Sequence, residues 1–198
     1  MFRPIGLNRG LDSITREFLN WILKREFKKI RLKYEFEETV VIPQIDSKSI
    51  KLPGLGEVTM EKGKVMRVYR GVANQLADSG WVKIGEERLT SKDIVSMRWL
   101  ESSEEGFIKL PDFFYLKATK LIRDDKSGKN IEIQNDLQEI VDIRLRKLFK
   151  LVFLKEVPSN IMERLQPEEV LLYSFLKETI NAWQRELMYV DGGEQDQE

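Results

Sequence analysis

The chain has 198 residues, of which 41% are hydrophobic and 33% are charged, and 33 Lys and Arg residues balance 33 Asp and Glu residues. It contains neither cysteine nor histidine. These absences exclude disulfide scaffolds, thiolate nucleophiles and cysteine-ligated metal sites, and they remove the usual neutral-pH general base. With no net charge, any attraction to nucleic acid or to an anionic membrane must come from local patches.

The first part of the chain predicts a helix followed by a small antiparallel sheet. Apolar residues recur at helical spacing over 11–29, whereas Ile30, Leu32, Tyr34 and Phe36 alternate with charged residues, which predicts a half-buried strand. Three shorter strands are predicted, the last two around a Pro-Gly turn. They are TVVIP (39–43), SIKL (49–52) and EVTM (57–60).

The rest of the chain reads as helical. Predicted helices cover 66–80, ending at Gly80; 90–105, with a Thr or Ser cap; 111–125, opening on Pro111; 131–155; and 167 to about 190, opening on Pro167.

The predicted fold class is therefore α+β, a small N-terminal β-rich domain followed by a mainly α-helical bundle domain. The predicted domains are 1–62, with a helix and an antiparallel sheet, 63–190, the helical domain, and 191–198, a disordered acidic tail. The chain has no run of about twenty apolar residues and no signal-peptide core at its start. We expect a cytoplasmic protein.

The stretch LPDFFYLKATKLI (110–122) is apolar around most of a helix. Such a helix must be surrounded, either by its own bundle or by another subunit. The helices at 131–155 and 167–190 are similarly broad, and large exposed apolar patches are rare in monomers, so we expect an interface with another chain. Aromatic and arginine side chains most often dominate such interfaces. The candidates are Phe113, Phe114, Tyr115, Arg144 and Trp183.

Arg144 lies within the apolar line of its helix. A partly buried arginine needs carboxylate or carbonyl partners, so we expect a specific salt bridge, inside the fold or across an interface.

Two basic clusters leave a second interpretation open. One lies at 24–33 and includes Lys24, Arg25, Lys28, Lys29 and Arg31; the other lies at 144–150. Clustered cations bind phosphates by releasing counterions, so the alternative is a nucleic-acid-binding accessory protein that uses these two segments. The simpler explanation is a solvated cationic face around an amphipathic element.

Catalytic patterns are incomplete. The S-x-x-K motif at Ser174–Lys177 lies in an apolar helix without its usual partner motifs, and no glycine-rich segment completes a phosphate loop. Acidic pairs such as Asp124 and Asp125 have no placed partner that would hold a metal. We predict no catalytic, cofactor or metal site, and hence no enzyme.

The order of the helical motifs resembles the core of the GINS replication-complex subunits. The proline-led aromatic helix is followed by a long helix containing DIRLRKLFKL (142–151), and the upstream passage VANQLADSGWVKIGEERLTSKDI (72–94) is also similar. The matching positions are Pro111, Phe114, Tyr115, Lys120, Leu121, Asp142, Arg144, Lys147 and Leu148. A small sheet placed before the helical core resembles the second and third eukaryotic PSF subunits, and hence the archaeal "two-three" subunit.

The resemblance implies a non-catalytic scaffold in DNA replication. Such a subunit joins a GINS subunit of reverse domain order in a 2:2 heterotetramer, with no cofactor and no membrane. The complex links the minichromosome maintenance (MCM) helicase to a RecJ-like, Cdc-type protein, with primase as a further partner. This implies a nucleoid-associated location and leaves direct DNA contact open.

Overall fold

The computed structural model describes residues 9–52, 56–85, 88–125, 128 and 130–188. The chain divides into two compact units, Met1–Arg88 (unit 1) and Leu89–Glu198 (unit 2). The boundary predicted between residues 62 and 63 therefore lies inside unit 1. The acidic tail predicted at 191–198 lies outside the described residues.

Unit 1 begins with a single long helix, α1, which spans Arg9–Glu35. The strand predicted from residue 30 to 36 was wrong, because the helix continues to Glu35 and Phe36 N still bonds to Leu32 O at 3.0 Å. Arg, Leu, Lys and Glu in this segment all favour helix. Tyr34 shares a helical face with Ile30, four residues earlier, and the Arg70 guanidinium lies 4.7 Å above its ring.

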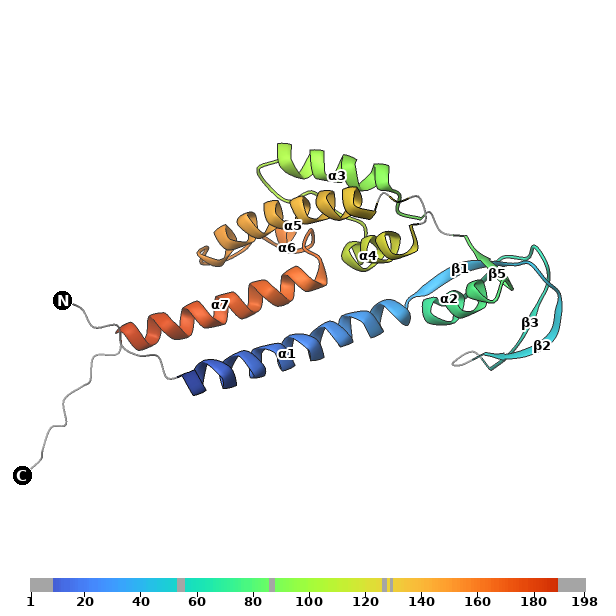
Figure 1. Ribbon diagram of the computed structural model, residues 1–198, viewed down its shortest axis with the longest axis horizontal. Coiled ribbons are helices and arrows are strands. Elements are labelled where there is room, and N and C mark those ends of the chain that lie inside the picture. Colours follow the sequence, from blue (N-terminus) through green and yellow to red (C-terminus); the bar gives the residue numbers. More distant parts are fainter. Residues whose placement is uncertain (1–8, 53–55, 86–87, 126–127, 129, 189–198) are drawn as a thin grey trace, which may run out of the picture. The chain divides into compact units, whose positions relative to one another are not determined.

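The sheet of unit 1 combines strands that are distant in sequence (Figure 1). β1 (Glu38–Pro43) lies between β4 (Met66–Tyr69) and β5 (Val82–Ile84), antiparallel to both. β2 (Ser47–Leu52) and β3 (Gly56–Met60) form a separate antiparallel pair. The three strands predicted between residues 39 and 60 are confirmed as elements, but β1 pairs with strands beyond them.

The helix predicted over 66–80 is shorter in the structure. Its first four residues are β4, and α2 spans only Arg70–Asp78. Gly80 adopts a φ of +75°, which glycine tolerates without strain, and Trp81 N then donates to Leu76 O at 2.9 Å. The helix end predicted at Gly80 is confirmed.

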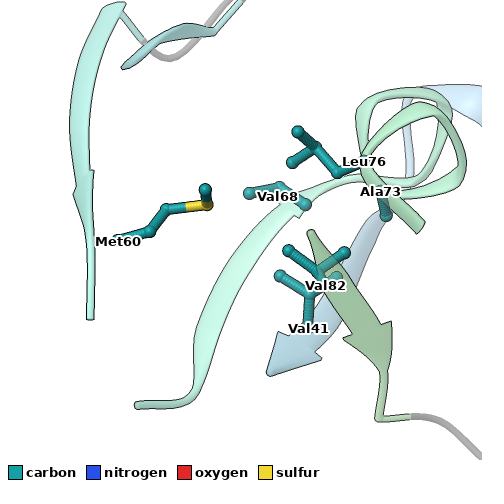
Figure 2. Packing of buried hydrophobic residues seen from close by; sticks show 6 residues of the cluster. All are labelled: Val41, Met60, Val68, Ala73, Leu76 and Val82. Atoms are coloured by element: carbon teal, nitrogen blue, oxygen red, sulfur yellow. The ribbon is translucent and has the colours of Figure 1, made fainter. Parts of the chain in front are cut away.

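A small hydrophobic core holds unit 1 together. Figure 2 shows side chains from the sheet, from α2 and from β3 converging, with Met60 directed from β3 towards Val68. The buried members are Val41, Met60, Val68, Ala73, Leu76 and Val82. Because β4, α2 and β5 supply most of this core, a division at residue 62 would cut through it.

Unit 2 is a helical bundle in which α5 lies between α3 and α7 (Figure 1). Its helices are α3 (Ser91–Ser103), α4 (Phe114–Asp124), α5 (Asn130–Val152), α6 (Ser159–Met162) and α7 (Pro167–Met188). One core cluster contains Ile94, Leu110, Phe114, Ala118, Ile133 and Ile140. A second contains Phe107, Leu148, Leu151 and Leu165. The predicted fold class, a strand-rich region followed by a helical bundle, is confirmed.

Helix starts in unit 2 follow local chemistry. The predicted cap of α3 is confirmed as a capping box, in which Asp93 N donates to Thr90 Oγ1 at 3.3 Å and Thr90 N donates to Asp93 Oδ2 at 2.7 Å. The start of α7 at Pro167 is also confirmed. By contrast, α4 begins at Phe114 and not at Pro111, because Phe113 adopts a left-handed φ of +55° that interrupts the helix.

Candidate subunit interface

A buried arginine organises the centre of unit 2. Arg144, on α5, is 1% exposed, and its Nε and Nη2 bond to the two carboxylate oxygens of Glu169 at 2.6 and 2.8 Å. Its Nη1 bonds to Glu101 Oε2 at 2.7 Å. The carbonyls of Ile108 and Arg164 accept further bonds at 3.2 and 2.9 Å. A guanidinium has five N–H donors, so every one has an acceptor.

Neighbouring polar groups complete this network. Lys147 Nζ bonds to Glu101 Oε1 at 2.6 Å, and Tyr115 OH donates to Glu169 Oε1 at 2.5 Å. The cations Arg144 and Lys147 therefore balance the two carboxylates. Burial opposes the charged guanidinium, but hydrogen bonding and charge from Glu169, with the charge of Glu101, raise the pKa of Arg144 above its ordinary value. Burial, reinforced by Glu169, also raises the pKa of Tyr115.

The network fixes the irregular chain between helices. Glu101 Oε2 accepts from Ile108 N at 3.2 Å, and Lys147 Nζ donates to Gly106 O at 2.6 Å. Next to the network, the side chain of Gln166 accepts from Phe114 N at 3.0 Å and so satisfies the first turn of α4. These contacts tie α3, α4, α5 and α7 together. Since its charged groups pair with one another inside the bundle, loss of any one of them would leave a buried charge without its partner.

Most of the predicted interface residues lie inside this bundle. Phe113 and Phe114 are buried, Tyr115 is half-buried, and Arg144 forms its salt bridges within its own unit. These four side chains are packed or bonded by their own bundle, and their contact with another subunit stays a prediction. Trp183 is different, at 62% exposed.

The helices of unit 2 coincide with a known domain. A family model described as the GINS complex protein helical bundle domain (Sld5) matches residues 84–188, from the end of β5 to the end of α7. The chain belongs to the GINS family. No curated protein matches it. The resemblance to GINS subunits predicted from the sequence is thereby confirmed.

The GINS bundle carries large apolar side chains on its surface. Trp99 on α3 is 69% exposed, and Trp183 is accompanied on α7 by exposed Leu187 and Met188. Phe149 and Phe153 are exposed near the end of α5. Sequence reasoning missed Trp99, because its helix has no clear apolar side that would have singled out this ring.

The two basic segments of this GINS chain differ in how many of their cations are exposed. In the segment 144–150, Arg144 and Lys147 are engaged in the buried network, whereas Arg146 and Lys150 are exposed. The segment 24–33 lies on α1, where Lys24, Arg25, Lys28, Lys29 and Arg31 are all exposed. The segment 24–33 therefore offers more exposed cations to an external anion than the segment 144–150 does.

The described part of the GINS chain has neither an acidic metal site nor a membrane-spanning helix. Within it, no three or more Asp and Glu side chains gather in a way that could hold a metal ion. None of the described helices combines the length and apolarity needed to cross a membrane.

Proposed function

We propose that this chain is a non-catalytic structural subunit of the GINS complex and acts in DNA replication through contacts with other GINS subunits. The match to the GINS helical bundle over residues 84–188 carries this proposal. The buried network supports a structural role for the bundle, because its charged groups pair with one another inside the fold.

We further propose that the chain is an archaeal subunit of the "two-three" class. The support is its element order, since the strand-rich unit precedes the bundle. Its partner would then be a GINS subunit with the reverse domain order, in a 2:2 heterotetramer.

Two exposed tryptophans of the bundle are suited to contact with such a partner. Trp99 and Trp183 are each more than half exposed. A tryptophan presents about 200 Å² of surface, so covering the exposed part of each ring would stabilise a complex by about 3 kcal/mol. A partner that covers these side chains removes apolar surface from water, which is why we place the subunit interface on the bundle.

As a helicase accessory scaffold, the assembled complex would link the MCM helicase to a RecJ-like, Cdc-type protein, with primase as a further candidate partner. It would act in the cytoplasm, in association with the nucleoid. The implied mode of action is docking: each partner binds a different surface, and the bundle holds them at fixed positions. This assignment rests on the family relationship.

Co-expression tests the assembly directly. The full chain is expressed alone and with a GINS subunit of reverse domain order, and the mass of each product is measured by light scattering after size-exclusion chromatography. We expect co-elution at the mass of two copies of each chain. A stable monomer that captures no GINS subunit would overturn the proposal.

A further inference from the structure

One side of α1 combines exposed aromatic rings with cations. Phe18 and Trp21 are 60% and 55% exposed, and their rings stack with centroids 6.3 Å apart and an interplanar angle of 22°. The guanidinium of Arg25 lies 4.9 Å from the centre of the Trp21 ring. Large rings exposed as a stacked pair beside a cation provide a flat platform with positive charge at its edge.

The cations continue this side of the helix. Lys24, Lys28 and Arg31 follow Trp21 at steps of three, four and three residues, so the four side chains form one row along α1. We call this row, with Phe18 and Arg25, the basic–aromatic face. All its members are exposed.

Little negative charge offsets the face. Between residues 24 and 33 the only carboxylate is Glu26, which is already paired with Lys29 at 2.8 Å and with Arg25 at 3.1 Å. Glu17 lies four residues before Trp21 and Glu35 lies four residues after Arg31, so these two carboxylates are close only to the ends of the row. The middle of the face therefore attracts anions.

We propose that the basic–aromatic face of α1 binds single-stranded nucleic acid. The cations would contact successive phosphates, and unpaired bases would stack on Trp21 and Phe18. Proteins that bind single strands without reading their sequence combine these two features, a cationic track and aromatic platforms. A duplex would use the cations but not the rings, because its bases are already stacked on each other.

A partner helix fits this face less well. Helices pack by inserting side chains between residues spaced three and four apart, and three of the four positions in the row are Lys or Arg. Burying those charges against another helix is costly unless each meets a carboxylate. A single nucleic acid strand offers both phosphates and unstacked bases, and so it matches a surface that combines cations with aromatic rings.

This inference does not depend on the proposed assembly. α1 lies outside residues 84–188, which match the GINS bundle, so failure of one proposal leaves the other standing.

Fluorescence anisotropy of a labelled oligothymidylate tests the cations, using the full chain and its complex with a GINS partner. The variant Lys24→Gln/Lys28→Gln/Arg31→Gln is compared with Lys51→Gln/Lys62→Gln/Lys83→Gln, which removes the same charge from exposed positions elsewhere in unit 1. We expect the first variant to reduce the slope of log affinity against log salt by about two, since each lost phosphate contact removes ~0.7 from it. The second should retain the wild-type slope.

The rings are tested separately. Trp21→Ala should weaken oligothymidylate binding roughly tenfold or more, as expected for loss of a stacked base. Trp81→Ala, which removes another partly exposed tryptophan of unit 1, should leave binding unchanged. Far-UV circular dichroism verifies that α1 remains folded in each variant.

Three results would overturn the inference. The first is no binding by the wild-type chain at low salt. The second is equal affinity for duplex DNA or polyglutamate, which would indicate plain attraction between opposite charges. The third is loss of subunit assembly in the α1 charge variant without any change in oligothymidylate binding, which would assign the face to a protein partner.

Discussion

Arg144 and Glu169 form a bidentate ion pair, at 2.6 and 2.8 Å, in the interior of the GINS bundle. The pair joins the middle of α5 to the first turn of α7. Because Glu101 and Lys147 extend it to α3, one side chain connects three helices through charge–charge contacts.

Replacing the central arginine should be strongly destabilising. Arg144→Met leaves Glu101 and Glu169 buried without their main cation, and breaking a buried pair in this way typically costs about 3–5 kcal/mol. Arg146→Met, on the exposed side of the same helix, should change the free energy of unfolding by less than ~0.5 kcal/mol. Urea titration followed by circular dichroism measures both. Equal stability of the two variants would contradict the assigned role of Arg144.

Tyr115 should make the bundle sensitive to alkali. Its pKa is raised in the folded protein, so the folded state holds this proton more tightly than the unfolded state. The stabilisation is fully present below the ordinary tyrosine pKa of about 10 and is lost as pH rises above it. We expect the free energy of unfolding to fall more steeply above pH ~10 in the wild type than in Tyr115→Phe. Parallel curves for the two proteins, measured by urea titration at each pH, would show that Tyr115 has an ordinary pKa.

The capping box of α3 should contribute measurably to stability. Thr90→Ala removes the side chain that accepts from Asp93 N, and loss of an N-cap costs about 1 kcal/mol. Ser96→Ala, at an exposed position in the middle of the same helix, should be neutral or slightly stabilising. Thermal unfolding of both variants provides the comparison, and a Thr90→Ala protein as stable as wild type would exclude a significant cap.

Trp183 should contribute to assembly and not to folding. Because the ring is mostly exposed, Trp183→Ala should leave the stability of the isolated chain unchanged. If the GINS partner covers it, the substitution should weaken subunit association roughly 10- to 100-fold, as for an aromatic hot spot. Trp21→Ala serves as the matched control, with unchanged association. Titration calorimetry distinguishes the outcomes, and an unaffected affinity would move the interface elsewhere on the bundle.

The unit boundary makes a prediction about fragments. A fragment of residues 89–188 retains the bundle and its buried network, so it should unfold cooperatively on its own. A fragment that begins at residue 63 keeps β4 and β5 without β1, their common partner. Amide hydrogen exchange should show protection only beyond residue 88 in that longer fragment. Protected amides in β4 would mean that the strand does not require β1.

Local signals in the sequence were sufficient for several elements. The Thr90 cap with Asp93, the proline at the start of α7 and the glycine after α2 act within a few residues of each element end, so their chemistry is readable from the sequence. The position of Arg144 in an apolar line correctly indicated a salt bridge.

The predictions that were wrong concern segments whose structure depends on residues far away in the sequence. Ile30 and Tyr34 fit both a two-residue and a four-residue repeat, so their spacing alone did not distinguish strand from helix. β4 becomes a strand because it pairs with β1, more than twenty residues earlier. Phe114 and Trp183 are both large aromatic residues on helices, so residue type alone does not predict which ring is buried. The packing of the bundle buries Phe114 and leaves Trp183 exposed.

All five N–H donors of the Arg144 guanidinium are hydrogen-bonded, and this affects how the bundle can open. If the first turn of α7 separated from α5, Glu169 would leave and a guanidinium would remain in an apolar interior with three of its five bonds. Such a partly open bundle is unfavourable, so this turn and α5 should come apart only in a single all-or-none transition. The far end of α7, beyond the reach of that charge, is free to fray and to become ordered when a neighbour binds.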